Sequence, residues 1–448
     1  MEGATTKKKA VYSLASYRYG LGNFFTTIIT NLSSTYFSAF LTISVGLSAA
    51  AMGSAMSIAS VVDTISIPII GILIQKSNFK SGKFRPWILW GAIACAIFNW
   101  LRFNNFGLTG ASAVFYFGAM YTLCYLAYNF VYCPYTGLLP VLAPDPGDRA
   151  SYAACRIQCN SIAKFLLSLV AVTLFEKIGY STFAAILSVL CFLGFYQLYM
   201  MAKPYDIPEP VGETGKARAS DVSIWEMIRS IISYPMLMFL IAGILKIATY
   251  FSVTSLSVYY YTYVIGDKAL LTVYLSASTA LMIGGAFLTP FVSKLAGGAR
   301  NAYIIGGIIY GGSMLISFAT QGNALLFTIL LAVGYVGYSF MHSAEAAVYS
   351  NLVDYTLIKT GKDLKGFLMT IFSLSPKVGG IFQGLILGVG LSLIGFNAEN
   401  ITDQAVAGLP VLFALLPAIL LAIVIVAMLL YPLTDKKIAE MKKQAGIE

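Results

Sequence analysis

Long apolar runs separated by short polar or basic stretches dominate the chain from residue 20 to residue 432. The runs lack the period-2 alternation of β-strands, and most are long enough to cross a bilayer as a helix, which takes about 20 apolar residues. Only helices and closed barrels satisfy every backbone group in lipid, so the pattern predicts an all-α membrane protein with about twelve transmembrane helices. The expected spans are 20–42, 48–75, 86–103, 111–138, 152–175, 181–201, 235–263, 269–295, 301–320, 323–352, 366–395 and 408–432.

The longest polar stretch, 202–222, is rich in proline, glycine and charge and divides the spans into two groups of six. Directly after it, Ser223 and Glu226 match a capping box, and the apolar stripe that follows predicts a short amphipathic helix on the membrane surface. The predicted domains are an N-terminal six-helix bundle (1–201), a cytoplasmic linker with this helix (202–234), and a C-terminal six-helix bundle with a short cytoplasmic tail (235–448).

Composition agrees with a membrane location. Hydrophobic residues make up 58% of the chain and charged residues only 11%, whereas soluble domains carry about 25% charged residues. Most of the 29 Lys and Arg residues fall on one side of the predicted spans, and only Arg102, Lys177 and Lys268 fall on the other. The positive-inside rule then places both termini in the cytoplasm. The net charge of +10 belongs to this basic belt, which favours anionic lipid headgroups and needs no nucleic acid.

Asp63 lies in the middle of the apolar segment from Ser48 to Ile74. A charge at bilayer depth is costly, and an intramembrane carboxylate usually faces a water-filled or protein-lined cavity. Asp63 is therefore a candidate functional residue. The alternative is a carboxylate neutralised by a nearby Lys or Arg that only locks two helices together.

Other charges also fall inside the predicted spans, and basic ones outnumber acidic ones. They are Arg156, Lys164, Lys246, Lys377 and Glu345, with Asp354 near a helix end. A cavity with surplus positive charge favours an anion, because an arginine binds a carboxylate through two hydrogen bonds. The alternative is internal pairing, in the combinations Lys377 with Asp63 and Lys246 or Lys164 with Glu345.

His342 is the single histidine, and it precedes Glu345 by almost one helical turn. It is a candidate proton relay, the alternative being a packed, hydrogen-bonded histidine. Tyr125, Tyr128 and Tyr132 are spaced so that they share one helix face, which we expect to line a cavity and to suit a flat or amphipathic solute.

Five segments resemble the glycoside–pentoside–hexuronide cation symporters. They are Asp63–Gly71, Ser81–Leu89, Arg18–Gly22, Cys133–Pro140 and Asn351–Tyr355, and together they extend over nearly the whole chain. The resemblance implies the major facilitator fold, in which two six-helix bundles surround a central cavity that opens alternately to each side. It also implies a multi-pass protein of the bacterial inner membrane that carries a small-molecule substrate together with a coupling cation.

The cation site that the resemblance implies is only partly present. Family members have two acidic positions one turn apart on the second helix, and here these are Asp63 and Ile67. Asp63, Ser66 and Asn129 still offer oxygen atoms to Na⁺, which prefers such ligands, and Asp63 is the candidate metal ligand. A single buried carboxyl group also suits a proton, because desolvation favours its neutral form. Loss of the second carboxylate favours H⁺ over Na⁺, or absent coupling.

The sugar-recognition positions depart further, since the acidic residues of galactoside-type members are replaced here by Thr27 and Tyr132. Arg156 and Lys377 remain as basic groups. The candidate substrate-binding residues are Thr27, Tyr128, Tyr132, Thr136, Arg156, His342, Ser373 and Lys377. Arg85 and Asp354 are the candidate cytoplasmic gate.

Phosphate-binding loops, metal-spaced histidines and serine elbows are absent from the sequence, which argues against an enzyme or an ATP-driven pump. We expect a monomeric secondary transporter without a cofactor that moves a glycoside, hexuronide or other organic anion by H⁺- or Na⁺-coupled symport. Two other functions stay open. One is an uncoupled facilitator of a non-sugar or amphipathic solute. The other is a non-transporting sensor, which would need an appended soluble signalling domain, and the tail from Thr434 to Glu448 is too short for one.

Overall fold

The computed structural model describes residues 13–77, 79–142, 146–206, 233–360, 368 and 374–445. These residues form helices joined by short loops, and β-structure among them is limited to one isolated bridge between Phe79 and Gly82. The chain divides into two compact units, Met1–Phe40 with Val62–Thr214 and Leu41–Val61 with Gly215–Glu448. The amphipathic helix predicted after Ser223 lies outside the described residues, as does Ser373.

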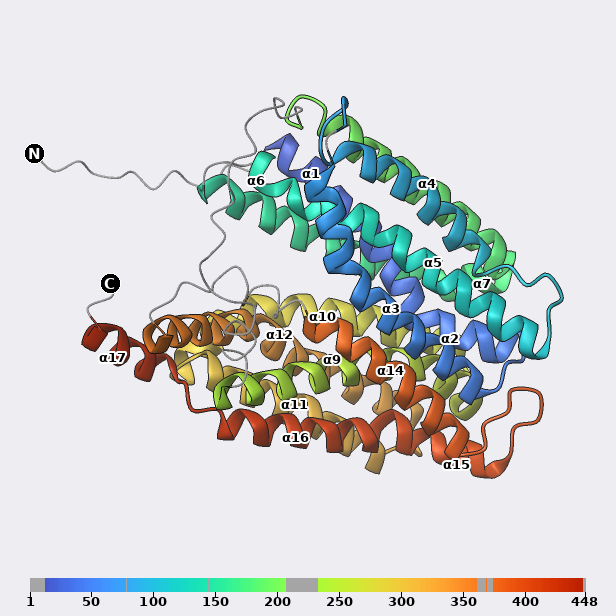
Figure 1. The fold of residues 1–448 in the computed structure, drawn as a ribbon. Coiled ribbons are helices and arrows are strands. Elements are labelled where there is room, and N and C mark those ends of the chain that lie inside the picture. Colours follow the sequence, from blue (N-terminus) through green and yellow to red (C-terminus); the bar gives the residue numbers. More distant parts are fainter. Residues whose placement is uncertain are drawn as a thin grey trace, which may run out of the picture. The chain divides into compact units, whose positions relative to one another are not determined.

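The first helix begins earlier than predicted, because a capping box precedes the apolar run. Ser13 Oγ accepts from the Ser16 amide, and Ser16 Oγ accepts from the Ser13 amide, each at 3.1 Å. Further along, the helix changes to π-helical turns. The elements up to residue 206 are α1 (Leu14–Asn31), η1 (Leu32–Tyr36), α2 (Phe37–Ala39), η2 (Phe40–Ser44), α3 (Ala49–Lys76), α4 (Arg85–Leu101), α5 (Gly110–Gly137), α6 (Leu139–Leu142) and α7 (Pro146–Met201) (Figure 1). Of these, most of η2 and the first half of α3 belong to the second unit, because that unit includes Leu41–Val61.

The second unit is built from helices of membrane-spanning length as well. The span predicted at 323–352, the tenth of the chain, extends to Thr360 in the structure. Here too short π-helical segments interrupt long helices. The elements are α9 (Tyr234–Tyr260), η3 (Tyr261–Ile265), α10 (Lys268–Leu295), α11 (Ala299–Ala319), α12 (Ala324–Thr360), α14 (Leu374–Leu393), α15 (Asp403–Pro410), η4 (Val411–Leu415), α16 (Leu416–Leu430) and α17 (Asp435–Ala445).

Nine helices in the described part of the chain are long and apolar enough to cross a membrane. One of them, α7, consists of two spans joined at Gly179, whose φ of 78° interrupts the helical backbone. Two further predicted spans correspond to α4 and to the run from α1 to η2, in which polar residues such as Asn23 and Thr26 lower the hydropathy. The prediction of an all-α protein with about twelve spans is therefore confirmed.

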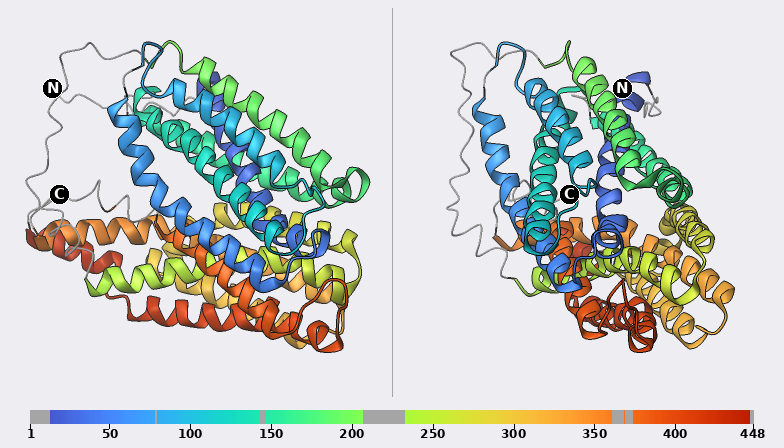
Figure 2. Two further views of the ribbon diagram at one scale, coloured as in Figure 1. Left: turned by 45° about the vertical axis from the view of Figure 1, so that its right-hand side comes forward. Right: turned by 90° about the vertical axis from the view of Figure 1, so that its right-hand side faces the viewer.

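Small residues allow the helices of each unit to approach closely. In the first unit, a Cβ on Gly20 of α1 would lie 2.8 Å from the Cys155 carbonyl oxygen of α7. In the second, a Cβ on Gly306 of α11 would lie 2.5 Å from the Gly337 carbonyl oxygen of α12. Only glycine tolerates these contacts, and close backbone approach is how membrane helices gain packing energy. Both views of Figure 2 show α16, drawn in red, at an outer edge of the second unit.

Each unit contains an aspartate that caps a neighbouring helix. Asp206 accepts backbone hydrogen bonds from Lys83, Phe84 and Arg85 at 2.8–2.9 Å, at the start of α4. Asp435 accepts the backbone hydrogen bond of Ala299 at 2.8 Å, at the start of α11. Negative charge at a helix N-terminus is stabilising because it meets free amide groups and the positive end of the helix dipole.

An arginine accompanies each of these caps. Arg85 Nε donates to the Tyr199 carbonyl oxygen at 3.1 Å, and Arg300 Nε donates to the Met428 carbonyl oxygen at 2.9 Å. In each unit, an aspartate and an arginine thus connect the turn after a long helix to the end of that unit's last span. The starts of α4 and α11 are thus held by matching hydrogen bonds in the two units, as expected for transporters built from repeats.

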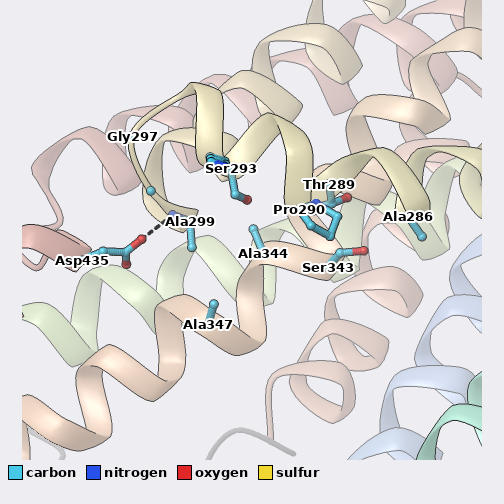
Figure 3. Close-up of a pocket in the computed structure, with 12 residues that line it drawn as sticks. Ala286, Thr289, Pro290, Ser293, Gly297, Ala299, Ser343, Ala344, Ala347 and Asp435 are labelled. Carbon is cyan, nitrogen blue, oxygen red and sulfur yellow. Dashed lines mark hydrogen bonds between the residues drawn. The ribbon is translucent and has the colours of Figure 1, made fainter. Parts of the chain in front are cut away.

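A cavity of about 610 Å³ lies beside the second cap, between α10, α12 and the start of α11. Its lining combines small side chains with the hydroxyl groups of Thr289, Ser293 and Ser343, and Asp435 borders it at one end (Figure 3).

Candidate functional site

Asp63, Ser66 and Asn129 form a compact polar cluster inside the first unit. Asn129 Nδ2 donates to Asp63 Oδ1 at 2.6 Å and to Ser66 Oγ at 2.9 Å. Ser66 Oγ donates to the Asp63 carbonyl oxygen at 2.8 Å. All three residues are buried, with 5% exposure for Asp63 and none for Asn129. The spacing on α3 brings Asp63 and Ser66 to one face, and α5 supplies the amide opposite them.

The amide oxygen of Asn129 accepts no hydrogen bond from any residue that the structure describes, although the atom is buried. A buried acceptor without a donor is costly, so this oxygen needs a cation, a proton donor or water. The donor set of one carboxylate with a neutral amide and a hydroxyl oxygen suits Na⁺, and a protonated Asp63 would equally supply a donor. Within the described ranges, no group of three or more His, Cys, Asp or Glu side chains is arranged to hold a metal ion.

Arg156 of α7 forms a second polar cluster in the same unit. Its Nη2 donates to Tyr132 Oη at 2.9 Å, and its Nε donates to Asn23 Oδ1 at 3.4 Å. The guanidinium carbon lies 5.8 Å from the Tyr132 ring centroid and 5.7 Å from that of Tyr135. In the described part of the chain, every hydrogen-bond partner of this half-buried cation is neutral. Among the described residues Nη1 has no hydrogen-bond partner, so it can donate to an anion.

A ladder of tyrosines on α5 connects the two clusters. The rings of Tyr128 and Tyr132 are stacked with centroids 5.4 Å apart, and Tyr125 contacts Tyr128 at 6.1 Å. Asn129 lies between Tyr128 and Tyr132 in the sequence. One turn of α5 therefore contributes both the amide that donates to Asp63 and the phenol that accepts from Arg156. Tyr125, Tyr128 and Tyr132 thus share one face of α5, and this part of the helix contacts both Asp63 and Arg156.

Thr27 and Thr136 direct their hydroxyl protons to their own helices. Thr27 Oγ1 donates to the Asn23 carbonyl oxygen at 2.7 Å, and Thr136 Oγ1 donates to the Cys133 carbonyl oxygen at 2.9 Å. Each hydroxyl oxygen still has a lone pair for a ligand, but its only proton is already used. These two positions offer acceptors, whereas Arg156 offers donors.

The candidate residues of the second unit gather around Glu345. Lys246 Nζ lies 2.5 Å from Glu345 Oε2, and His342 Nδ1 lies 3.9 Å from the same oxygen. Of the two lysines considered as partners for Glu345, the structure therefore selects Lys246. Lys377 lies on α14 and is half-buried, and the predicted binding residue Ser373 is outside the described residues.

Arg85 and Asp354, the predicted gate residues, each have partners within their own unit. Arg85 is buried, its Nη1 donates to the Ser81 carbonyl oxygen at 3.0 Å, and its guanidinium lies 4.4 Å from the Tyr199 ring centroid. Asp354 Oδ2 forms an ion pair with Lys442 Nζ at 2.7 Å, which joins α12 to α17. Their role as a gate stays a prediction.

Sequence reasoning missed Asn23 and the burial of Arg102. The placement of Arg102 among the outer-side charges stays a prediction, but its side chain is wholly buried, which only Asn99 three residues earlier could have signalled. Its guanidinium donates to Ser33 Oγ and to Asn99 Oδ1 at 2.5 Å, and to the Ile29 carbonyl oxygen at 3.3 Å. Asn23 could have been found as a polar residue four positions before Thr27 on the first helix.

Two units of membrane-length helices with buried polar clusters define a multi-span membrane transporter. The family model described as MFS/sugar transport protein matches residues 18–435, and the chain belongs to this family. The resemblance to the cation symporters and the expectation of a transporter rather than an enzyme are thereby confirmed. The protein moves a small-molecule solute across a membrane.

Relatives agree over nearly the full length. A Bacillus subtilis (strain 168) protein named Uncharacterized symporter YjmB is 29% identical over 437 residues, which cover 94% of this chain and 93% of that protein. A Putative sulfoquinovose importer of Escherichia coli (strain K12) is 25% identical over 434 residues, covering 94% and 91%. The Glucuronide carrier protein homolog of the same organism is 24% identical over 436 residues, covering 94% and 93%.

Solved structures share the fold. A crystal structure of the nucleoside transporter NupG superposes with a TM-score of 0.66 at 13% sequence identity, covering 94% of this chain and 99% of that one. At this identity the likeness concerns the fold alone, and it supports the major facilitator architecture that the sequence predicts.

Proposed function

We propose that this protein is a cation-coupled symporter of a small anionic sugar derivative, such as a hexuronide or a sulfonated sugar. The observation that carries the proposal is Arg156, a half-buried guanidinium whose described hydrogen-bond partners, Tyr132 and Asn23, are neutral. A buried cation without a counter-ion is costly, and a bound carboxylate or sulfonate would remove that cost. The names of two relatives, a sulfoquinovose importer and a glucuronide carrier homolog, support the same substrate class.

The neighbouring tyrosines supply the rest of the recognition surface. Tyr128 and Tyr132 present stacked rings that suit the apolar face of a sugar, while their phenol groups donate and accept hydrogen bonds. Thr27 and Thr136 contribute hydroxyl acceptors for sugar hydroxyls. The site therefore combines one positive charge for the acid group with neutral groups for the ring.

We place the coupling site at Asp63, Ser66 and Asn129, with H⁺ or Na⁺ as the co-transported ion. The orphaned Asn129 oxygen supports an ion or proton at this cluster, because either would complete its hydrogen bonds or ligation. Because Asn129 and Tyr132 share a turn of α5, filling one cluster can change the position of the other. A coupling ion drives transport if its affinity differs between the two openings of the protein.

Uptake into proteoliposomes tests the proposal directly. A panel of neutral glycosides, hexuronides, sulfonated sugars and non-sugar organic acids is offered, each with an imposed H⁺ gradient, an imposed Na⁺ gradient or neither. We expect accumulation of an anionic sugar with one of the two ions. Accumulation of neutral glycosides alone would reject the anion proposal, and equilibration without accumulation under both gradients would identify an uncoupled facilitator.

The uncoupled facilitator is the second candidate, and one residue favours it. Ile67 occupies the position where the resembled family carries its second carboxylate, and an alkyl side chain cannot bind a cation. We nevertheless favour coupling, because Asn129 donates to both the Asp63 carboxylate and the Ser66 hydroxyl in a buried cluster. The distribution of Lys and Arg supports cytoplasmic termini, and the bacterial relatives support a location in the bacterial inner membrane.

A further inference from the structure

The proposed transport mechanism makes no use of the cavity of about 610 Å³ beside Asp435. All of its lining residues belong to the second unit, so the cavity lies within one compact part of the chain. Figure 3 shows side chains of α10 on one side of it and side chains of α12 on the other. Its volume falls in the range of about 300–1,000 Å³ that is typical of pockets for small molecules.

Helix α10 has two different exposed faces, and the cavity lies on the less apolar one. Phe287, Phe291 and Leu295 recur every four residues and are 81%, 64% and 73% exposed, so they form a stripe of the kind that faces lipid. Ala286 and Pro290 line the cavity, and each comes one residue before a phenylalanine of that stripe. They therefore lie about 100° around the helix from the apolar stripe.

The second half of α12 presents an exposed face without large apolar side chains. Its exposed residues between 341 and 350 are His342, Ser343, Ala346, Ala347 and Ser350, which recur at helical spacing. Polar residues in membrane helices usually face protein or water rather than lipid. The cavity thus lies between two faces of small and polar residues, which favours a ligand from water over a lipid.

Three side chains of the lining have hydrogen-bond donors available for a ligand. The hydroxyl groups of Ser293 and Ser343 make no hydrogen bond within the described ranges of the chain, and Lys294 forms no ion pair there. Ser293 and Lys294 come from the last turns of α10, and Ser343 comes from α12. A ligand in the cavity can therefore accept hydrogen bonds from both helices.

Two further side chains of the lining offer acceptors. Thr289 Oγ1 donates its proton to the Gly285 carbonyl oxygen at 3.0 Å, so the hydroxyl oxygen keeps a lone pair for a ligand. Asp435 accepts from the Ala299 amide at 2.8 Å and from Asn351 Nδ2. These two bonds fix the carboxylate at one end of the cavity, and a carboxylate has room for further donors.

The formal charges of the described lining cancel, because Lys294 contributes one positive charge and Asp435 one negative charge. An anion would be attracted by the lysine and repelled by the aspartate, and a cation would meet the reverse. A neutral molecule with many hydroxyl groups suits both, since each hydroxyl donates and accepts. The small apolar walls at Ala344 and Ala347 suit the C–H face of a saturated ring.

We propose that this cavity binds a neutral polyhydroxylated molecule of sugar size, at a site separate from Arg156. The site goes beyond the transport function proposed above, because it selects a neutral molecule whereas Arg156 selects an acid group. In the predicted orientation Lys294 lies on the cytoplasmic side, so the ligand reaches the cavity from the cytoplasm.

Protection of a single cysteine from a thiol reagent tests the site in the full chain. Ala347→Cys places the thiol in the lining, and Ala346→Cys places it on an exposed neighbour outside the lining. Both are made in a variant without the native cysteines and react with N-ethylmaleimide in detergent micelles. The probes are methyl glucoside, methyl galactoside, methyl xyloside and myo-inositol at millimolar concentration. We expect at least one probe to slow the reaction of Ala347→Cys several-fold and to leave Ala346→Cys unchanged. Absence of protection by every probe would overturn the proposal.

Changes in the lining show whether protection depends on the cavity. Ser293→Ala together with Ser343→Ala, combined with Ala347→Cys, removes two donors and should raise the half-protecting concentration by about tenfold. Ala286→Leu fills the cavity from α10 and should abolish protection. Each variant is used only if its thermal unfolding matches that of the parent, and either one decides if the other does not fold. Unchanged protection in a folded variant would contradict the proposal.

A double variant separates this cavity from the proposed transport site. Arg156→Ala/Tyr132→Ala removes the acid-binding and ring-binding groups of the first unit, and we expect protection of Ala347→Cys to persist in it. Loss of protection there would show that the thiol reports a conformational change caused by binding at Arg156, and would overturn the proposal.

A charged probe tests the chemical class of the ligand. Methyl glucuronide should protect no better than methyl glucoside, because Asp435 offsets Lys294. Stronger protection by the glucuronide that disappears in Lys294→Gln would assign an anion site and reject the neutral class. The measurement involves neither a gradient nor transport, so its failure leaves the symport proposal standing, and failure of symport leaves this site unaffected.

Discussion

The Asn129 side chain donates to Asp63 Oδ1 at 2.6 Å, whereas its own amide oxygen accepts nothing from the residues that the structure describes. A neutral amide that donates to a carboxylate in this way fixes its orientation and leaves its charge unchanged. Since Asp63 is 5% exposed, a cation or proton there gains a strong electrostatic interaction at low local dielectric. This relationship leads to the first prediction.

Replacing Asp63 with Asn should separate exchange from accumulation. The substitution keeps the size of the side chain and one oxygen that can accept from Asn129, but it removes the charge that binds the ion. We expect counterflow of labelled solute to persist in proteoliposomes, while accumulation under an H⁺ or Na⁺ gradient falls to the uncoupled level. Asp63→Glu, which keeps a carboxylate, is the control and should retain part of the accumulation. Full accumulation in Asp63→Asn would move the coupling ion to another site.

Arg156 should decide the affinity for the acid group of the solute. Truncation to Ala removes a charged hydrogen-bond donor from a half-buried site, which typically costs 2–5 kcal/mol, so we expect affinity to fall by about 100-fold. Arg156→Lys keeps the charge but loses the planar fork, and should give an intermediate loss. Binding is measured by calorimetry on purified protein whose thermal unfolding matches wild type. Unchanged affinity in Arg156→Ala would exclude this residue from the binding site.

Single cysteines should report the orientation of the chain. Lys80 and Lys203 are exposed in the structure and fall on the predicted cytoplasmic side, and Lys268 is exposed and falls on the other side. In a variant lacking the native cysteines, a membrane-impermeant thiol reagent applied to intact cells should label Lys268→Cys but not Lys80→Cys or Lys203→Cys. All three should react after permeabilisation. Labelling of Lys80→Cys in intact cells would reverse the predicted topology.

Arg102 should contribute to stability because its guanidinium supplies several buried hydrogen bonds at once. Arg102→Leu leaves Asn99 Oδ1 without its donor, whereas the Ile29 carbonyl oxygen keeps the hydrogen bond from Ser33 Oγ. A buried unsatisfied acceptor costs roughly 1–3 kcal/mol, so we expect the free energy of unfolding to fall by about 2 kcal/mol. Arg102→Lys keeps the charge without the fork and should lose nearly as much. Wild-type stability of Arg102→Lys in thermal unfolding would show that charge alone matters there.

The two caps should respond alike to substitution. Asp206→Ala and Asp435→Ala each remove a carboxylate from a helix N-terminus, and each should lower the free energy of unfolding by about 1–2 kcal/mol. The matched Asn variants keep a capping oxygen and should lose less. Because the caps lie in different units, the double Ala variant should show the sum of the two losses. A larger loss in the double variant, measured by denaturation in micelles, would indicate coupling between the caps.

The sequence by itself determined the helices and the shared faces along them. Apolar runs and their lengths depend on local composition, so the spans, the Asp63–Ser66 face of α3 and the tyrosine face of α5 follow from spacing along one helix. The family motifs added the partner Asn129, which spacing along α3 could not supply. Even the kink at Gly179 was anticipated as a break between two predicted spans.

Tertiary structure alone decided which charges meet. Lys246 and Lys164 were equal candidates for Glu345 in the sequence, and the choice depends on α9 packing next to α12. Arg102 lies at the end of an apolar helix, and helix packing buries it against Ser33. Hydrophobic periodicity reports the distance of a side chain from lipid, whereas an ion pair or a cap depends on the rotation and depth of a second helix, which no local pattern encodes.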